Sequence, residues 1–311
     1  MVTQNIDGID FVALHYPFNR FDAIKITTET RDINKHLQYI HKKNIEKAYI
    51  VLPNLNFLYD CTNLKFLRIA PSHDVDKVFD FSPLYQMPEV RYLNCVNTFG
   101  FNNNSIAEID YAKITGLQTL AVDANKGSLN FDLIPTLKTL IVGNYKSKTG
   151  DISNLFSSAE LDTLRLVGCK NNSLNGIEKS TKIQCVYLSH NRVLQDISAL
   201  KKVNKTLKAL RIENCSQIKD FSVLKELHSL ELLELSGSNT LKNLDFIKEL
   251  PNLKTFVFNM DVVNGDLTPC LNLSYVFSEK NRKHYNLKDT DLPKKQYIRG
   301  NENIEEWRKL E

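Results

Sequence analysis

One short pattern, Leu-x-x-Leu-x-Leu, recurs along most of the chain and constrains its fold more than any other feature. Alternate side chains of an extended segment point to opposite faces, so each copy places an apolar row on one side of a short strand. A single repeat cannot bury its own row, whereas stacked copies bury a continuous core. The clear copies begin at Leu64, Val90, Leu117, Leu137, Leu161, Ile183, Leu207, Leu230 and Leu253. Weaker copies begin at Phe21, Ile45 and Leu273.

The ninth residue of a repeat is often polar or a cysteine. It is Asn125, Cys169, Asn191 or Cys215 in the better copies and Ser238 or Asp261 in weaker ones. A polar side chain that is buried where the chain leaves a strand is expected to bond the turn backbone, because an unpaired amide there is costly. We therefore predict that these cysteines are structural and not reactive thiols.

A second motif, Asp-Phe/Ile-Ser-x-Leu, precedes several repeat starts by ten or eleven residues. Its copies begin at Asp80, Asp151, Asp196 and Asp220. Asp and Ser accept hydrogen bonds from the free amides that open a helical turn, and the apolar residues fix that turn on the core. Each copy is predicted to form a short helical turn on the side opposite the strands, and the repeated carboxylates and hydroxyls are not read as a catalytic series.

Together these motifs resemble the leucine-rich-repeat superfamily, most of all its class of about 22 residues per repeat. That class includes the bacterial internalins and the regulatory subunit of protein phosphatase 1. The resemblance covers roughly residues 45–278. It implies an α/β solenoid, a leucine-rich-repeat horseshoe with a parallel β-sheet on its concave face and short helical turns on its convex face. It also implies that the concave face binds another protein. No signal peptide or wall-anchoring tail is evident, which argues against the surface-adhesin role of internalins.

The two ends are predicted to differ from the repeats. Residues 1–44 contain strand-like stretches at 11–16 and 23–28 and a helix-like stretch at 32–43, and we expect them to form an N-terminal cap. Residues 45–278 are the predicted solenoid. In residues 279–311 the leucine register fades, and Ile304, Trp307 and Leu310 are spaced as one apolar stripe of a short helix. This stretch is a C-terminal cap or a tail that docks a partner.

Composition limits the classes of function. The 40 basic and 36 acidic residues are interspersed and leave a formal charge of +4, so a nucleic-acid-binding surface is not expected. No stretch approaches the roughly 18 apolar residues of a membrane span. The six cysteines form no Cys-x-x-Cys pair and are expected to be reduced. The sequence predicts a cytoplasmic protein that is a monomer on its own.

Motifs that carry chemistry are missing from the sequence. No metal-ligand spacing, nucleophile elbow or dinucleotide fingerprint occurs, and the phosphate-loop-like stretch 143–149 lacks a glycine before its lysine. The residues after 279 are too few for an independent catalytic domain. We therefore predict that the chain is not an enzyme and that it has no catalytic residue, no cofactor and no metal.

The candidate site lies in the variable residues between the leucines. Positions three, five, seven and eight of a repeat are expected to point away from the core. Exposed aromatic and arginine side chains on rigid strands are typical of interface hot spots. The predicted partner-binding residues are Tyr49, Phe66, Arg68, Tyr92, Asn94, Arg165, Tyr187, His190, Arg211, Glu213 and Glu234. Tyrosines also favour strands for structural reasons alone, which is the alternative reading of each of them.

The predicted function is a protein-binding module that grips a protein partner on its concave face. One concrete form is an inhibitor or immunity-type protein that covers the active site of its target. Two alternatives remain open. The same arginines could bind a nucleic acid or another anionic polymer, although Glu213 and Glu234 oppose this. The chain could also be a non-catalytic subunit of an enzyme complex.

Overall fold

The computed structural model describes residues 3–14, 22–70, 79–95, 108–124, 127–295 and 297, and it divides into two compact units. Unit 1 comprises Met1–Lys138 with Glu305–Glu311, and unit 2 comprises Thr139–Ile304. The division falls inside the predicted solenoid. The cap boundaries at residues 44 and 279 stay predictions.

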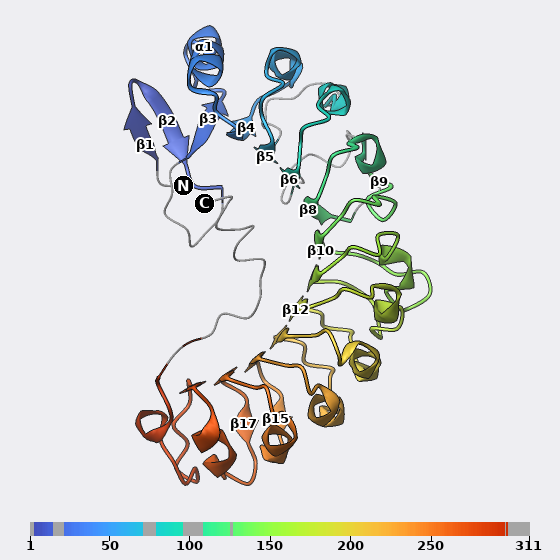
Figure 1. Ribbon diagram of the computed structural model, residues 1–311, viewed down its shortest axis with the longest axis vertical. Coiled ribbons are helices and arrows are strands. Elements are labelled where there is room, and N and C mark those ends of the chain that lie inside the picture. Colours follow the sequence, from blue (N-terminus) through green and yellow to red (C-terminus); the bar gives the residue numbers. More distant parts are fainter. Residues whose placement is uncertain are drawn as a thin grey trace. The chain divides into compact units, whose positions relative to one another are not determined.

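Unit 1 contains a sheet whose first strands are antiparallel and whose later strands are parallel. In order, its strands are β1 (Gln4–Ile6), β2 (Ile9–Val12), β3 (Ala23–Thr27), β4 (Lys47–Val51), β5 (Phe66–Ile69), β6 (Tyr92–Asn94) and β8 (Thr119–Asp123). The strands β7 (Ile109–Asp110) and β9 (Ser128–Leu129) form a separate parallel pair. Its helices are α1 (Ile33–Lys43) and the 3-10 helices η1 (Asn56–Asp60), η2 (Ser82–Gln86) and η3 (Tyr111–Lys113), which lie on the side away from the strands (Figure 1).

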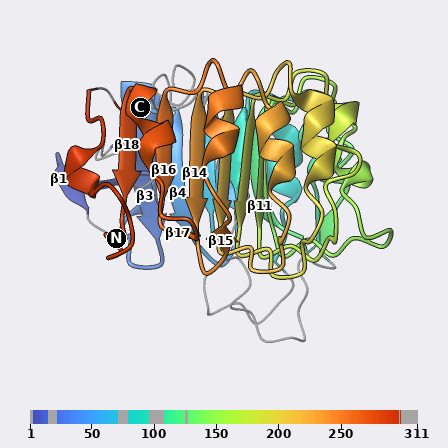
Figure 2. The same cartoon turned by 90° about the horizontal axis from the view of Figure 1, so that it is seen from below.

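Unit 2 contains a sheet that is parallel throughout (Figure 2). In order, its strands are β10 (Thr139–Gly143), β11 (Thr163–Val167), β12 (Cys185–Ser189), β13 (Ala209–Glu213), β14 (Leu232–Ser236), β16 (Thr255–Phe258) and β18 (Tyr275–Ser278). The strands β15 (Thr240–Leu241) and β17 (Asp261–Val262) form a second parallel pair. Its 3-10 helices are η4 (Ser153–Leu155), η5 (Ile177–Lys179), η6 (Ser198–Val203), η7 (Ser222–Glu226), η8 (Asp245–Glu249), η9 (Thr268–Asn272) and η10 (Asp289–Asp291).

The register predicted from the leucines is confirmed. In the two main sheets, each strand from β3 onward begins two residues after a predicted repeat start, as β13 begins at Ala209 after Leu207. The fourth and sixth residues of a repeat face the core, where Leu164 and Leu166 are 0% exposed. Stacked copies of one short strand therefore bury the apolar row that a single copy could not.

The predicted helical turns are also confirmed, as 3-10 helices. Before η7, the Oδ1 atom of Asp220 accepts a hydrogen bond from the backbone N–H of Ser222 at 2.8 Å. The aspartates at 80, 151 and 196 accept in the same way at 2.8, 3.0 and 2.8 Å. The Asp-Phe/Ile-Ser motif thus satisfies an amide that opens each turn.

In two of the better copies the ninth position of the repeat bonds the backbone, as expected, whereas Ser238 is exposed and Asp261 binds the side chain of Arg282. The amide of Asn191, which is 0% exposed, accepts from the N–H of Cys169 at 2.7 Å and donates to the carbonyl of Leu166 at 2.9 Å. The thiol of Cys215 lies 3.7 Å from the carbonyl of Leu188. All six cysteines are buried and form no disulfide, and burial raises the pKa of Cys270 to about 12. Asn125 lies outside the described residues.

The ends contain elements that the sequence partly indicated. The predicted helix appears as α1, whose N-cap Asp32 accepts from the backbone N–H of Lys35 at 3.0 Å. The stretch predicted at 11–16 is described only to residue 14, as the end of β2. Strand β1 was missed because its side chains are all exposed and show no apolar alternation. The stripe of Ile304, Trp307 and Leu310 lies outside the described residues.

Candidate functional site

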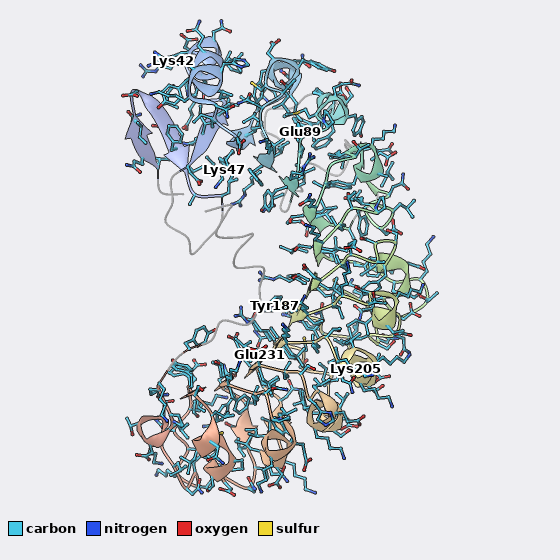
Figure 3. The ribbon with its side chains drawn as sticks, viewed as in Figure 1. Lys42, Lys47, Glu89, Tyr187, Lys205 and Glu231 are labelled. Atoms are coloured by element: carbon cyan, nitrogen blue, oxygen red, sulfur yellow. The ribbon has the colours of Figure 1, made fainter. Side chains whose placement is uncertain are left out.

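The strand face of unit 2, meaning the side of its sheet away from the helical turns, carries most of the predicted site. Parallel pairing in register aligns the fifth residues of successive repeats into one row. This row consists of Ile141, Arg165, Tyr187, Arg211, Glu234, Val257 and Phe277. Neighbouring side chains of the row stand on adjacent strands about 4.8 Å apart. Figure 3 shows Tyr187 on this face and Lys205 on the opposite side of unit 2.

The third position of the repeat does not behave as expected. Apart from the half-buried Tyr275, its side chains in unit 2 are buried instead of exposed, and Cys185, Ala209 and Leu232 are each 0% exposed. They form an apolar cluster with Tyr187, which covers them and is itself only 9% exposed. The expectation that Tyr187 is exposed is therefore wrong, and its contact with a partner stays a prediction. Its ring instead packs as a second apolar layer above the start of the strands.

Arg211 lies between an aromatic ring and a carboxylate. Its guanidinium carbon is 4.9 Å from the ring centroid of Tyr187, a cation–π distance. Its Nε atom is 2.9 Å from Oε2 of Glu234, and both side chains are about a quarter exposed, at 29% and 25%. Packing on one side and charge on the other leave Arg211 little freedom to move. Tyr187, Arg211 and Glu234 thus form a preorganised row.

A polar network runs beside this row at positions seven and eight. The hydroxyl of Ser189 donates to Oε2 of Glu213 at 2.8 Å and lies 2.8 Å from Nδ1 of His190. Nδ2 of Asn214 lies 3.3 Å from Nε2 of His190. One protonation pattern satisfies all three contacts, with His190 carrying its proton on Nδ1 and accepting from Asn214 at Nε2. The network fixes the direction of the Glu213 carboxylate.

The backbone at position eight supports the same network. His190 and Asn214 have φ angles of +57° and +53°, in the left-handed region that L-residues seldom adopt, and Gly168 and Gly237 hold the equivalent places. Their N–H groups reach across to the next strand, as that of His190 does to the carbonyl of Glu213 at 2.8 Å. The strands therefore end alike and present His190 at a fixed place.

Side chains of the row, with Ser189 and Glu213 of the network, line a hollow of about 350 Å³ on the strand face. Its polar lining consists of Arg165, Tyr187, Ser189, Arg211, Glu213, Glu234 and Ser236. Arg165 and Glu213 are exposed, whereas the row between them is held by internal contacts. Within the part of the chain that the structure describes, no hydrogen bond or ion pair holds the Arg165 guanidinium. Unit 2 therefore brings together a fixed floor and two accessible groups of opposite charge.

The predicted residues of unit 1 make internal contacts. The guanidinium carbon of Arg68 is 5.5 Å from the ring centroid of Tyr49, and its Nη1 atom donates to the carbonyl of Leu14 at 3.5 Å. The ammonium of Lys47 is 5.9 Å from the ring centroid of Phe66. Tyr49 and Phe66 also pack on an apolar cluster. That cluster consists of Val12, Leu14 and Ala23.

Tyr92 of unit 1 is buried, which corrects a second expectation. It is 1% exposed, and burial raises the pKa of its phenol well above the usual range. The half-buried Asn94 donates to its hydroxyl at 3.2 Å. Tyr92 occupies the third position of its repeat, the position that is buried in most repeats of unit 2. Sequence alternation alone does not separate this position from the fifth.

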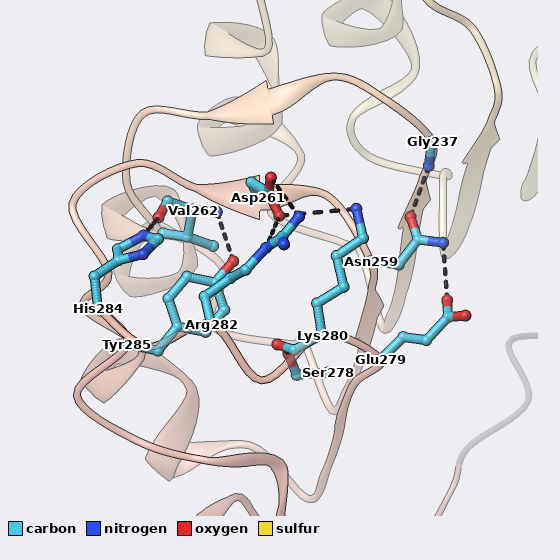
Figure 4. Close-up of polar contacts among 10 residues, drawn as sticks. All are labelled: Gly237, Asn259, Asp261, Val262, Ser278, Glu279, Lys280, Arg282, His284 and Tyr285. Carbon is cyan, nitrogen blue, oxygen red and sulfur yellow. Dashed lines mark hydrogen bonds and ion pairs between the residues drawn. The ribbon is translucent and has the colours of Figure 1, made fainter.

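A polar cluster at the end of unit 2 was not found from the sequence (Figure 4). Asn259 accepts from the N–H of Gly237 at 2.7 Å and donates to Glu279 at 2.8 Å. Arg282 donates to both oxygens of Asp261 at 2.8 and 2.9 Å and holds the pKa of that carboxyl below its usual range. Asn259 and Glu279 are the seventh residues of their repeats. That position in the repeat was the sequence signal by which they could have been found.

Two further findings concern the described residues alone. No group of three or more His, Cys, Asp and Glu side chains there is placed to hold a metal ion. No helix in those ranges combines the length and apolar character needed to cross a membrane.

Comparison with known proteins gives structural likeness only. No family model matches the chain, and no curated protein matches it in sequence. An internalin of Listeria monocytogenes, InlF, is similar over 76% of this chain and 67% of its own, with 19% identity and a TM-score of 0.54. A second Listeria monocytogenes internalin, InlC2, covers 61% of this chain and 76% of its own at 20% identity and a TM-score of 0.43. The repeat register and the likeness to InlF show that the chain has a leucine-rich-repeat fold, similar to that of an internalin.

Proposed function

We propose that the chain is a protein-binding module and that the strand face of unit 2 is its contact surface. The observation that carries the proposal is the pair of exposed, opposite charges, Arg165 and Glu213, beside the fixed row of Tyr187, Arg211 and Glu234. A preorganised surface binds at a lower cost in side-chain entropy. Aromatic and arginine side chains in such a setting are the usual anchors of protein interfaces.

The mixture of charges favours a protein over a polyanion as the partner. Arg165 and Arg211 stand among Glu213 and Glu234, so the surface has no net positive charge to attract a phosphate backbone. A protein surface can present a carboxylate to Arg165 and a cation or amide to Glu213. A patch of about 800 Å² on each partner would be an ordinary size for such an interface.

The experiment compares the wild-type chain with the double variant Arg165→Ala/Glu213→Ala in quantitative affinity purification. The matched control is Lys205→Ala/Glu226→Ala, which removes the same two charges from exposed residues of the turn side. Two lost contacts of about 0.7 kcal/mol each would weaken binding roughly tenfold. We expect a partner whose recovery falls with the face variant and not with the control. Equal recovery of every protein by the three chains would refute the proposal.

The alternative of an anionic-polymer binder predicts a different pattern. Retention on heparin would fall with Arg165→Ala and rise with Glu213→Ala, because each removed carboxylate lowers repulsion. A protein interface needs both residues, so each single variant would weaken it.

The finer parts of the function also belong to this proposal. We propose an inhibitor or immunity-type role in the cytoplasm, where the six buried cysteines would stay reduced. Assay of the recovered partner's own activity, with and without the chain, tests the inhibitory role. Outside the charge pair, five residues stay predicted contacts of the partner. They are Tyr49, Phe66, Arg68, Asn94 and His190.

A further inference from the structure

The segment that follows β18 folds back onto the strand face of unit 2. Lys294 forms an antiparallel bridge with Tyr275, and the N–H of Val276 donates to the carbonyl of Pro293 at 2.8 Å. Tyr297 follows shortly after. Its hydroxyl donates to Oε1 of Glu234 at 2.7 Å, and its ring meets that of Tyr275 edge to face, with centroids 5.2 Å apart. A side chain from the same chain therefore occupies part of the candidate surface.

Glu234 is shared between this tyrosine and the fixed row. Its Oε2 atom faces Arg211 at 2.9 Å, while its Oε1 atom accepts the phenol of Tyr297. A cation placed at Oε1 would stand close to the Arg211 guanidinium, and a carboxylate would meet Glu234 itself. A phenylalanine would leave the carboxylate oxygen without a donor. The chemistry of this place therefore favours a neutral aromatic hydroxyl.

On the basis of the proposed function, we infer that Glu234 and Tyr275 form a tyrosine-binding subsite, which Tyr297 fills in cis and a tyrosine of the protein partner takes over. Tyr297 is 37% exposed, and the anchor of its segment is separate. The ammonium of Lys294 contacts Asp289 at 2.7 Å and lies over the Tyr275 and Phe277 rings. Tyr297 can leave Glu234 while Lys294 keeps the edge of β18 covered.

The surroundings of the subsite fit an aromatic segment of a partner. Phe277 is 39% exposed, and the half-buried Val257 stands between it and Glu234 in the row. An incoming tyrosine would bury its ring beside these side chains and give its hydroxyl to Glu234. Because Tyr297 is tethered next to the subsite, its effective concentration there is in the millimolar range, and the partner must compete with it.

The first test needs no partner and uses the full chain. Saturation-transfer NMR measures binding of the peptide acetyl-Lys-Gln-Tyr-Ile-amide, and of its Tyr→Phe form, to the wild type and to Tyr297→Ala. We expect the tyrosine peptide to bind Tyr297→Ala and not the wild type, and the phenylalanine form to bind about tenfold more weakly, as for one hydrogen bond to a charged group. Adding Glu234→Ala should abolish the difference between the peptides. Tyr297→Phe, which keeps the ring, should admit the tyrosine peptide to an intermediate degree.

Three results of this test would overturn the subsite. They are equal binding of both peptides to Tyr297→Ala, binding of the tyrosine peptide to the wild type as strongly as to the variant, and no binding to the variant or to Tyr297→Phe at millimolar peptide. The two variants together guard against a loss of folding in either one, which thermal unfolding would reveal.

The second test concerns the partner. In the affinity purification described above, Tyr297→Ala should raise partner affinity about three- to tenfold by removing the competitor in cis. Unchanged or lower affinity would overturn the takeover by the partner. Failure of the proposed function would be distinguishable, because partner recovery would then be the same for Arg165→Ala/Glu213→Ala as for the wild type. Failure of the subsite would instead show in the binding of the two peptides.

Discussion

The strand faces of the two units follow the same repeat and differ in how far internal contacts hold their side chains. In unit 1, Arg68 lies over Tyr49 and donates to the carbonyl of Leu14. In unit 2, the equivalent Arg165 is exposed and is held by no ion pair among the described residues. Both arginines are fifth residues of their repeats. The position in the repeat thus sets the direction in which a side chain points. The neighbouring segments decide whether that side chain is exposed to a partner.

The difference has a structural origin in the first strands. In unit 1 the antiparallel pair β1–β2 joins the sheet, and Val12 and Ala23 stand opposite each other where β2 meets β3. With Leu14 they form an apolar cluster against which Tyr49 and Phe66 pack. Unit 2 is parallel throughout its described strands. Its apolar cluster consists of residues of its own strands and is covered by Tyr187, while Arg165 stays exposed.

The largest expected effect is on the free energy of unfolding. It tests whether the cores of the two units are equally sensitive to truncation although their strand faces differ. Leu67 and Leu210 are both fourth residues of their repeats and both 0% exposed. Each change to alanine should lower the free energy of unfolding by about 2–5 kcal/mol, since it removes buried methyl groups and leaves a cavity. Urea unfolding followed by circular dichroism measures this. A loss below about 1 kcal/mol in only one unit would show that its core tolerates truncation and would end the equivalence.

A smaller effect is expected on the turn side, which is also alike in the two units. Asp80 and Asp220 each accept from the backbone N–H of a serine at 2.8 Å. Each change to alanine should cost about 1 kcal/mol of unfolding free energy, as for the loss of a cap, and each change to asparagine should cost less. Unequal losses from the two alanine variants would show that the turns are not equivalent.

The cap at Asp220 also makes a prediction about pH. Hydrogen bonds from the backbone and hydroxyl of Ser222 hold the pKa of Asp220 below its ordinary value of 3.8. Because the folded pKa is the lower one, the stabilisation is present above pH 3.8 and is lost as the pH falls through the folded value. The advantage of the wild type over Asp220→Asn should therefore shrink below about pH 4. An advantage that stays constant down to pH 2 in urea unfolding would contradict this origin.

The fold was predictable because each of its determinants is local and periodic. The leucines at positions four and six set the register, and the aspartate motif sets the turns, so β13 and η7 appear where Leu207 and Asp220 place them. The site was less predictable because it depends on contacts between repeats. Neither the burial of Tyr92 nor the contact of Tyr297 with Glu234 follows from alternation along one strand.

The smallest expected effect tests the opening comparison directly, through two arginines of one column. Arg68→Ala should lower the free energy of unfolding by about 0.5–1 kcal/mol, because it removes the cation–π contact with Tyr49 at a half-buried site. Arg165→Ala should change it by less than about 0.5 kcal/mol, as an exposed side chain without a described ionic contact does. Partner affinity should respond in the opposite order, with Arg165→Ala the more harmful. If Arg165→Ala destabilised the chain more than Arg68→Ala did, Arg165 would be part of the fold, and the surface proposed here would lose its most accessible group.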